Sequence, residues 1–217
     1  MPLFQQSVQK KFIAELDKVR VENAYQKLIA HFHNPSIQEN IRNAKEEEYQ
    51  EGFVRDLFVN VLGYVLNPQP NFNLVLEKKN ERNSKKADGV ILTMGHVPLV
   101  KAVVELKSIK TVDLQSIEIQ AFGYKNNQSD CVYIITSNFQ KIRFYIENAI
   151  EFEEFDLFDI SKERFALLYL CLQADCILSD LPLRVKKLSL EKEESITNKL
   201  YADYSLFKQV LFKDVAA

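Results

Sequence analysis

Two apolar segments separated by a short turn constrain the fold of this chain more than any other feature. Residues 86–108 read KADGVILTMGHVPLVKAVVELKS. Both apolar segments are rich in β-branched residues, which favours strands, and the residues between them include glycine and proline, which favour a turn. We therefore predict a β-hairpin, with Asp88 at the start of its first strand and Glu105 and Lys107 near the end of its second.

Glu105 and Lys107 are two residues apart, so in a strand they lie on one face while Val104 and Leu106 lie on the other. A carboxylate and an ammonium at the end of a buried strand are costly unless they are paired or bind a ligand. One interpretation is an edge strand with a Glu-Lys surface pair. The other is a metal site, because Mg²⁺ prefers one or two carboxylates, acidifies water and neutralises charge on a phosphate.

Composition describes one ordinary globular domain with an appendage. The chain has 217 residues, of which 47% are hydrophobic and 27% are charged, and no apolar run is long enough to span a membrane. The N-terminal residues lack the apolar core of a signal peptide, and the three cysteines form no C-x-x-C pair, so we expect a cytoplasmic protein with reduced thiols. A net charge of −2 implies that any nucleic-acid contact is a local patch.

Hydrophobic spacing predicts helices on both sides of this hairpin. We expect helices over 8–33 and 37–62, the second ending at Gly63, a further helix after Lys107, and C-terminal helices over 165–170 and 190–212, with 179–188 as a connection. Further strands are expected at 72–76, 131–138 and 141–146. This pattern predicts an α/β fold of the α+β kind, a mixed sheet flanked by helices, with a C-terminal helical extension.

Asp88, then a spacer, then Glu105-x-Lys107 resembles the PD-(D/E)XK nuclease superfamily. Gln120-x-x-x-Tyr124 follows the second strand, and it resembles a motif found at that place in several branches of the superfamily. Ala87 stands where the family often has proline. The resemblance implies a Mg²⁺-dependent endonuclease, in which Mn²⁺ substitutes, with Asp88 and Glu105 as metal ligands and Lys107 as the residue that orients water.

The stretch EEEYQEGFVRDLFVNVLGY, at 46–64, resembles the start of single-chain type IIG restriction–modification enzymes. In that family a helix with a glutamate precedes an F-x(9)-G-[YV] stretch, which Phe53 and Gly63-Tyr64 would fill. The family's glutamate assists the metal site. Glu47 is our choice, since it precedes Val54 by one heptad. The other acids of this helix remain open alternatives, and a solvated acidic first turn is the simpler interpretation for most of them: Glu46, Glu48 and Glu51.

Residues 77–86 hold a basic cluster beside the predicted site. These side chains either follow a phosphate backbone or form a solvated loop. The cluster consists of Lys78, Lys79, Arg82, Lys85 and Lys86.

The resemblance divides the chain into an N-terminal helix (1–35), a nuclease domain (36–160) and a helical connector (161–217). It implies double-stranded DNA as substrate, methyltransferase and specificity domains in a longer chain, and a possible homodimer for double-strand cleavage. The last helix carries one apolar stripe, formed by Leu200, Tyr204, Phe207 and Leu211. The alternative is a catalytically inert module with the same fold that binds DNA or docks other domains. RNA or branched DNA as substrate also remains open.

Overall fold

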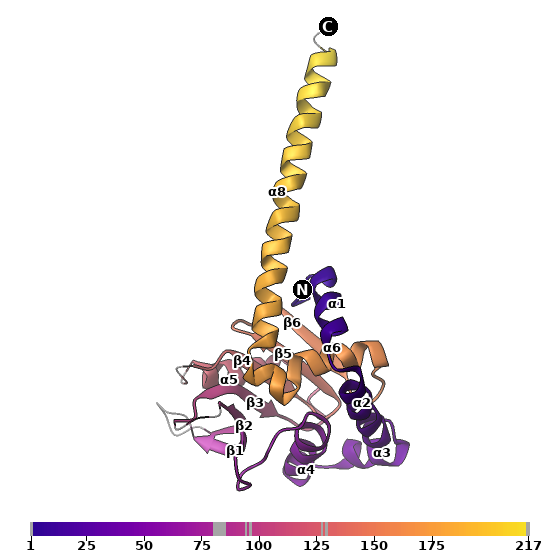
Figure 1. Ribbon diagram of the computed structural model, residues 1–217. Coiled ribbons are helices and arrows are strands. Elements are labelled where there is room, and N and C mark those ends of the chain that lie inside the picture. The colour runs from indigo at the N-terminus through magenta and orange to yellow at the C-terminus, as the bar shows by residue number, and fades with distance from the viewer. Residues whose placement is uncertain are drawn as a thin grey trace.

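The computed structural model describes residues 2–79, 86–93, 95, 97–126, 128 and 130–215. Its centre is a six-stranded sheet with the strands in sequence order (Figure 1). The strands are β1 (Leu74–Lys79), β2 (Lys86–Leu92), β3 (Val100–Leu106), β4 (Tyr133–Ser137), β5 (Lys141–Ile146) and β6 (Phe152–Asp156). Helices flank this sheet, so the predicted mixed α/β architecture is confirmed.

The predicted hairpin is confirmed as β2 and β3, which pair antiparallel with Gly89 opposite Val104 and Val90 opposite Val103. β3 then pairs parallel with β4, while the other described neighbours are antiparallel. A parallel pair needs a crossover, and α5 (Gln115–Lys125) supplies it. β3 therefore lies inside the sheet, with a hydrogen-bonded neighbour on each side.

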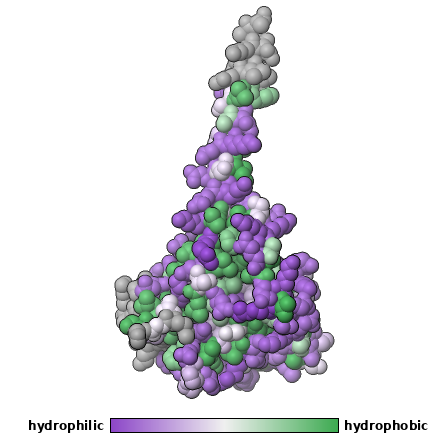
Figure 2. All heavy atoms as spheres, viewed as in Figure 1, coloured by the Kyte–Doolittle hydropathy of each residue, from purple (hydrophilic) through white to green (hydrophobic). Residues whose placement is uncertain are grey.

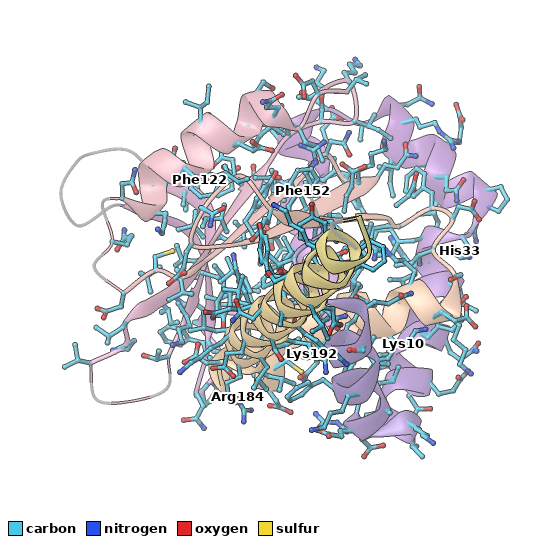
Figure 3. All side chains as sticks on the ribbon, turned by 90° about the horizontal axis from the view of Figure 1, so that it is seen from above. Lys10, His33, Phe122, Phe152, Arg184 and Lys192 are labelled. Carbon is cyan, nitrogen blue, oxygen red and sulfur yellow. The ribbon has the colours of Figure 1, made fainter. Side chains whose placement is uncertain are left out.

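The sheet has two covered faces, as the alternation along β3 and β4 requires. Val104 and Ile135 belong to the large core, which most of the helices cover. Val103 packs with Tyr124, and Ile134 packs with Ala121, so their face is covered by α5. Figure 3 labels Phe122 of α5 and Phe152 of β6, whose rings both contact Tyr145 on this face.

The N-terminal half contains more helices than the two that periodicity predicts. They are α1 (Gln6–Glu15), α2 (Lys18–Phe32), α3 (Pro35–Asn43), α4 (Glu46–Phe53) and the π-helix η1 (Val54–Val61). Asp17 interrupts the first predicted helix, because its carboxylate accepts the amides of Val19 and Arg20 and so starts α2. The second predicted helix breaks at Ala44-Lys45, before α4. Gly63 has φ +79°, so its predicted role in ending the helical segment is confirmed.

The C-terminal helices are α6 (Lys162–Leu172), α7 (Ala174–Leu178) and α8 (Leu181–Val215). The hydroxyl of Ser161 caps α6 by accepting the amide of Arg164. The predicted connection over 179–188 is wrong, since α8 begins at Leu181 and occupies most of it. Pro182 lies in the first turn of α8, where the missing amide proton costs nothing. The outer half of α8 projects away from the rest of the molecule (Figure 1).

None of the described helices is both long enough and apolar enough to cross a bilayer. The proposed boundaries at residues 35 and 160 stay predictions.

Candidate active site

Asp88 lies in β2, directly beside the end of β3. Its Oδ2 atom accepts the backbone amide of Leu106 at 2.7 Å, which fixes the carboxylate against the neighbouring strand. Burial raises the pKa of Asp88 above its ordinary value, while the Leu106 amide, the charge of Lys107 and a hydrogen bond from Gln50 act in the opposite direction. Asp88 is thus a partly exposed carboxylate with a fixed orientation.

Glu105 is the buried acid of the site. Its side chain is 0% exposed, and it lies on the α5 face of β3, as the predicted alternation with Val104 and Leu106 requires. The Oε1 atom accepts from Lys107 Nζ at 3.2 Å and from Gln120 Nε2. The Oε2 atom is buried and has no hydrogen-bond partner among the described residues. Burial, with the nearby charge of Asp88, raises the pKa of Glu105 to about 8.

Lys107 follows β3, and its position is fixed because its backbone amide donates to Ser137 O at 2.9 Å. Its ammonium donates to Glu46 Oε1 at 3.1 Å, Glu105 Oε1 at 3.2 Å and Leu106 O at 2.9 Å. Burial works against this charge, but the hydrogen bond to Glu46 and the surrounding carboxylates outweigh it and raise the pKa of Lys107. Lys107 is therefore a cation at neutral pH.

The helix glutamate that contacts Lys107 is Glu46, while a role for Glu47, the choice from sequence, stays a prediction. The ammonium of Lys107 donates to Glu46, whereas the side chain of Glu47 is exposed. The heptad argument pointed to Glu47 because Val54 marks the core-facing side of the helix, whereas the contact with Lys107 comes from the first residue of α4. Gln50, one turn after Glu46 on the same face, hydrogen-bonds Asp88. Sequence analysis missed Gln50, although its spacing of four residues from Glu46 was a usable signal.

The pair Gln120 and Tyr124 lies together on α5, as the spacing of four residues predicts. Gln120 Nε2 donates to both Glu105 Oε1 and the Tyr124 hydroxyl, the latter at 3.1 Å. Tyr124 is 5% exposed and packs in the small core with Val103, and burial raises its pKa. Tyr124 thus supports Gln120, and Gln120 holds Glu105.

Of the predicted basic cluster, only Lys86 has a described side chain. Lys86 is exposed and pairs with Glu77 at 3.0 Å. Lys78 and Lys79 lie in β1, but their side chains are outside the described residues, and Arg82 and Lys85 are outside them altogether. The site thus brings together Glu46, Gln50, Asp88, Glu105, Lys107, Gln120 and Tyr124 from four elements.

Within the described part of the chain, no group of three or more His, Cys, Asp and Glu side chains has the geometry of a metal cage. The site instead presents two fixed carboxylates, Asp88 and Glu105, with a cation beside them. Such a set of groups can bind a cation through oxygen atoms, hold a water molecule, or move a proton at Glu105.

Comparisons with protein-family models, with curated proteins and with solved structures find no match to this chain.

Proposed function

We propose that this chain is a Mg²⁺-dependent endonuclease that hydrolyses phosphodiester bonds in double-stranded DNA. The observation that carries the proposal is the contact of Glu46 and Glu105 with the ammonium of Lys107, beside Asp88, whose carboxylate is fixed by the Leu106 amide. Three carboxylates and one lysine at the open end of a central strand form a charged site that a purely structural sheet does not need.

The buried Oε2 atom of Glu105 supports binding of a hard cation. A buried carboxylate oxygen without a hydrogen bond is costly, and a metal ion is one partner that removes this cost. Asp88 and Glu105 would hold Mg²⁺, with Glu46 nearby, and two carboxylates with remaining water ligands suit this ion. When bound, such an ion acidifies water and neutralises charge on the scissile phosphate.

Lys107 would orient the attacking water and stabilise the negative charge that develops on the phosphate. It is held for this role by three contacts at its ammonium, to Glu46, Glu105 and the carbonyl of Leu106. Gln120 would keep Oε1 of Glu105 fixed, so that Oε2 faces the cation. Tyr124, through Gln120, is a positioning residue in this scheme.

The basic cluster of residues 78–86 would contact the phosphate backbone, with Lys86 at its described end.

The type IIG resemblance adds three further proposals. The chain would act beside methyltransferase and specificity domains of a longer protein, it would work in the cytoplasm as a restriction enzyme, and Mn²⁺ would replace Mg²⁺.

Plasmid nicking by the purified chain in Mg²⁺ or Mn²⁺ tests the proposal, with EDTA and Lys107→Ala as controls. We expect cleavage that needs the metal and is lost in the variant. Glu47→Ala is the matched control, since Glu47 is exposed on the same helix as Glu46 and makes no contact with Lys107.

Calorimetric titration of Mn²⁺ into the wild type and Asp88→Ala separates an inactive enzyme from an inert module. Binding that disappears in Asp88→Ala, without cleavage, would mean a metal site that needs a further domain for its substrate. No binding at all would sink the catalytic proposal and leave the DNA-binding or docking module.

A further inference from the structure

The outer part of α8 exposes a continuous apolar stripe. Ile196, Leu200, Tyr204 and Phe207 recur at intervals of four, four and three residues, so they share one helical face. Each is at least half exposed, at 50%, 67%, 61% and 61% respectively. Figure 2 shows hydrophobic residues on this projecting helix beyond the point where the rest of the molecule ends. The side chain of Leu211, the fourth residue of the predicted stripe, lies outside the described residues.

The stripe continues a face that is already buried at the base of the helix. Val185 and Ser189 are 0% and 2% exposed. Val185, Ser189, Ile196 and Leu200 follow one another at spacings of four, seven and four residues, so they lie on the same face. α1 lies beside a different face of α8, near Lys192, as Figure 3 shows in the view along the helix. The globular part of the molecule thus covers the lower end of the stripe face and leaves the upper end bare.

The charged residues beside the stripe are arranged so that they can pair with those of a second copy of this chain. Glu194 and Lys208 are two heptads apart, so they lie on the same edge of the stripe, and Tyr201 lies midway between them. In an antiparallel pair of identical helices, equal edges face each other. When Leu200 of each helix lies opposite Tyr204 of the other, Glu194 of each helix lies beside Lys208 of the other. Tyr201 of one helix then lies beside Tyr201 of the second copy.

The position of the globular part favours an antiparallel pair over a parallel one. Because the globular part covers the stripe face at Val185 and Ser189, a parallel partner would bring its own globular part into the same space. An antiparallel partner keeps the two globular parts at opposite ends. On the other edge of the stripe, Asp203 lies beside Asp203 of the second copy, and the repulsion between these two carboxylates weakens the dimer. Lys199 lies one turn away on the same helix and offsets part of this repulsion.

We propose that residues 194–208 of α8 form an antiparallel two-helix coiled coil with a second copy of this chain. The apolar stripe supplies the favourable free energy, and the Glu194–Lys208 pairs set the direction and the register, since exposed ion pairs contribute little to affinity. The proposal goes beyond the nuclease activity and does not depend on it, because none of these residues belongs to the candidate site.

Sedimentation equilibrium of the full chain tests this pairing. We expect a reversible dimer with a dissociation constant in the micromolar range, and only monomer for Leu200→Asp. Glu194→Lys and Lys208→Glu should each weaken the dimer about tenfold, because each replaces two attractive contacts by two repulsive ones. An equal mixture of these two variants should dimerise like the wild type, since both contacts are then complementary. Glu191→Lys, with the same charge change on the opposite face, is the matched control.

Tyr201→Cys gives a second readout that does not depend on affinity. The native cysteines Cys131, Cys171 and Cys176 are buried, so a new disulfide between chains would report residue 201. We expect rapid oxidation to a covalent dimer for Tyr201→Cys and not for Asn198→Cys, which lies on the outer face. A wild type that is monomeric at tenths of a millimolar, or a mixture of the charge variants that stays monomeric, would overturn the proposal.

Discussion

Gln120 donates its side-chain amide to the same oxygen of Glu105 that Lys107 contacts, and the other oxygen of Glu105 is left buried and unpaired among the described residues. The two oxygens of one carboxylate therefore have different environments. One is held by protein donors, and the other is available for a ligand or a proton. Much of the expected behaviour of the site follows from this asymmetry.

The raised pKa of Glu105 makes stability depend on pH. Its pKa is about 8 in the folded protein and 4.5 as the ordinary value, so between these values the folded state binds more protons than the unfolded state. This contribution to stability is fully present below pH 4.5 and is lost as the pH rises through 8. Urea unfolding in EDTA should show that Glu105→Gln is more stable than the wild type at pH 8, with the difference shrinking towards pH 5. An equal stability gap at both pH values would contradict the assignment.

A divalent cation should compete with that proton. We expect the affinity for Mn²⁺ to rise with pH up to about 8, with release of protons on binding, because the ligand form of Glu105 is the carboxylate. Calorimetry in two buffers of different ionisation enthalpy measures the number of protons released. Glu105→Gln should release none, while Glu47→Gln should match the wild type.

The register of α4 can be tested with neighbouring glutamates. Glu46→Gln removes a carboxylate that contacts Lys107, so we expect cleavage to fall by about tenfold to a hundredfold, a range typical of residues that orient the groups of a metal site. Glu47→Gln and Glu48→Gln should leave cleavage within about twofold, since both residues are exposed. Single-turnover cleavage rates measure all three. A larger loss in Glu47→Gln than in Glu46→Gln would contradict the observed register.

Gln120→Leu should reduce cleavage while leaving the free energy of unfolding almost unchanged. Gln120 is exposed, so its replacement should change the free energy of unfolding by no more than about 0.5 kcal/mol. The loss of its hydrogen bond to Glu105 should still reduce cleavage and move the pH profile of cleavage to higher pH, since one stabilising contact of the carboxylate is gone. Tyr124→Phe should give a smaller shift in the same direction. Ser116→Leu, on an exposed position of the same helix, is the control.

Phe53→Ala tests the packing that supports α4. Phe53 is 0% exposed, and its ring contacts those of Phe32, Phe58 and Phe139. Its removal leaves a cavity, and we expect a loss of about 3–5 kcal/mol in the free energy of unfolding by urea. A loss below about 1 kcal/mol would mean that α4 does not depend on this aromatic cluster.

Local chemistry predicted part of this structure from sequence. The alternation in β3 placed Glu105 and Lys107 on one face, and Gly63 marked the end of a helical segment, because each signal acts within a few residues. The breaks near Asp17 and Lys45 were missed, since neither contains glycine or proline. The start of α8 at Leu181 was missed, although proline, here Pro182, is tolerated in the first turn of a helix. Which glutamate of α4 contacts Lys107 depends on how α4 packs beside the sheet, and a sequence with four acids close together does not indicate this.

The contact between Lys107 and Glu46 joins residues that are 61 positions apart in the chain, while Asp88 and Leu106 are 18 apart and Gln120 and Glu105 are 15 apart. The Asp88–Leu106 and Gln120–Glu105 contacts can form within the hairpin and the helix that follows it. The Lys107–Glu46 contact instead requires closure of a much longer loop. We therefore expect the constellation to be completed late in folding, after the helical half has docked on the sheet. A nascent or proteolytically clipped chain that keeps the hairpin would hold most of the charged groups without their arrangement.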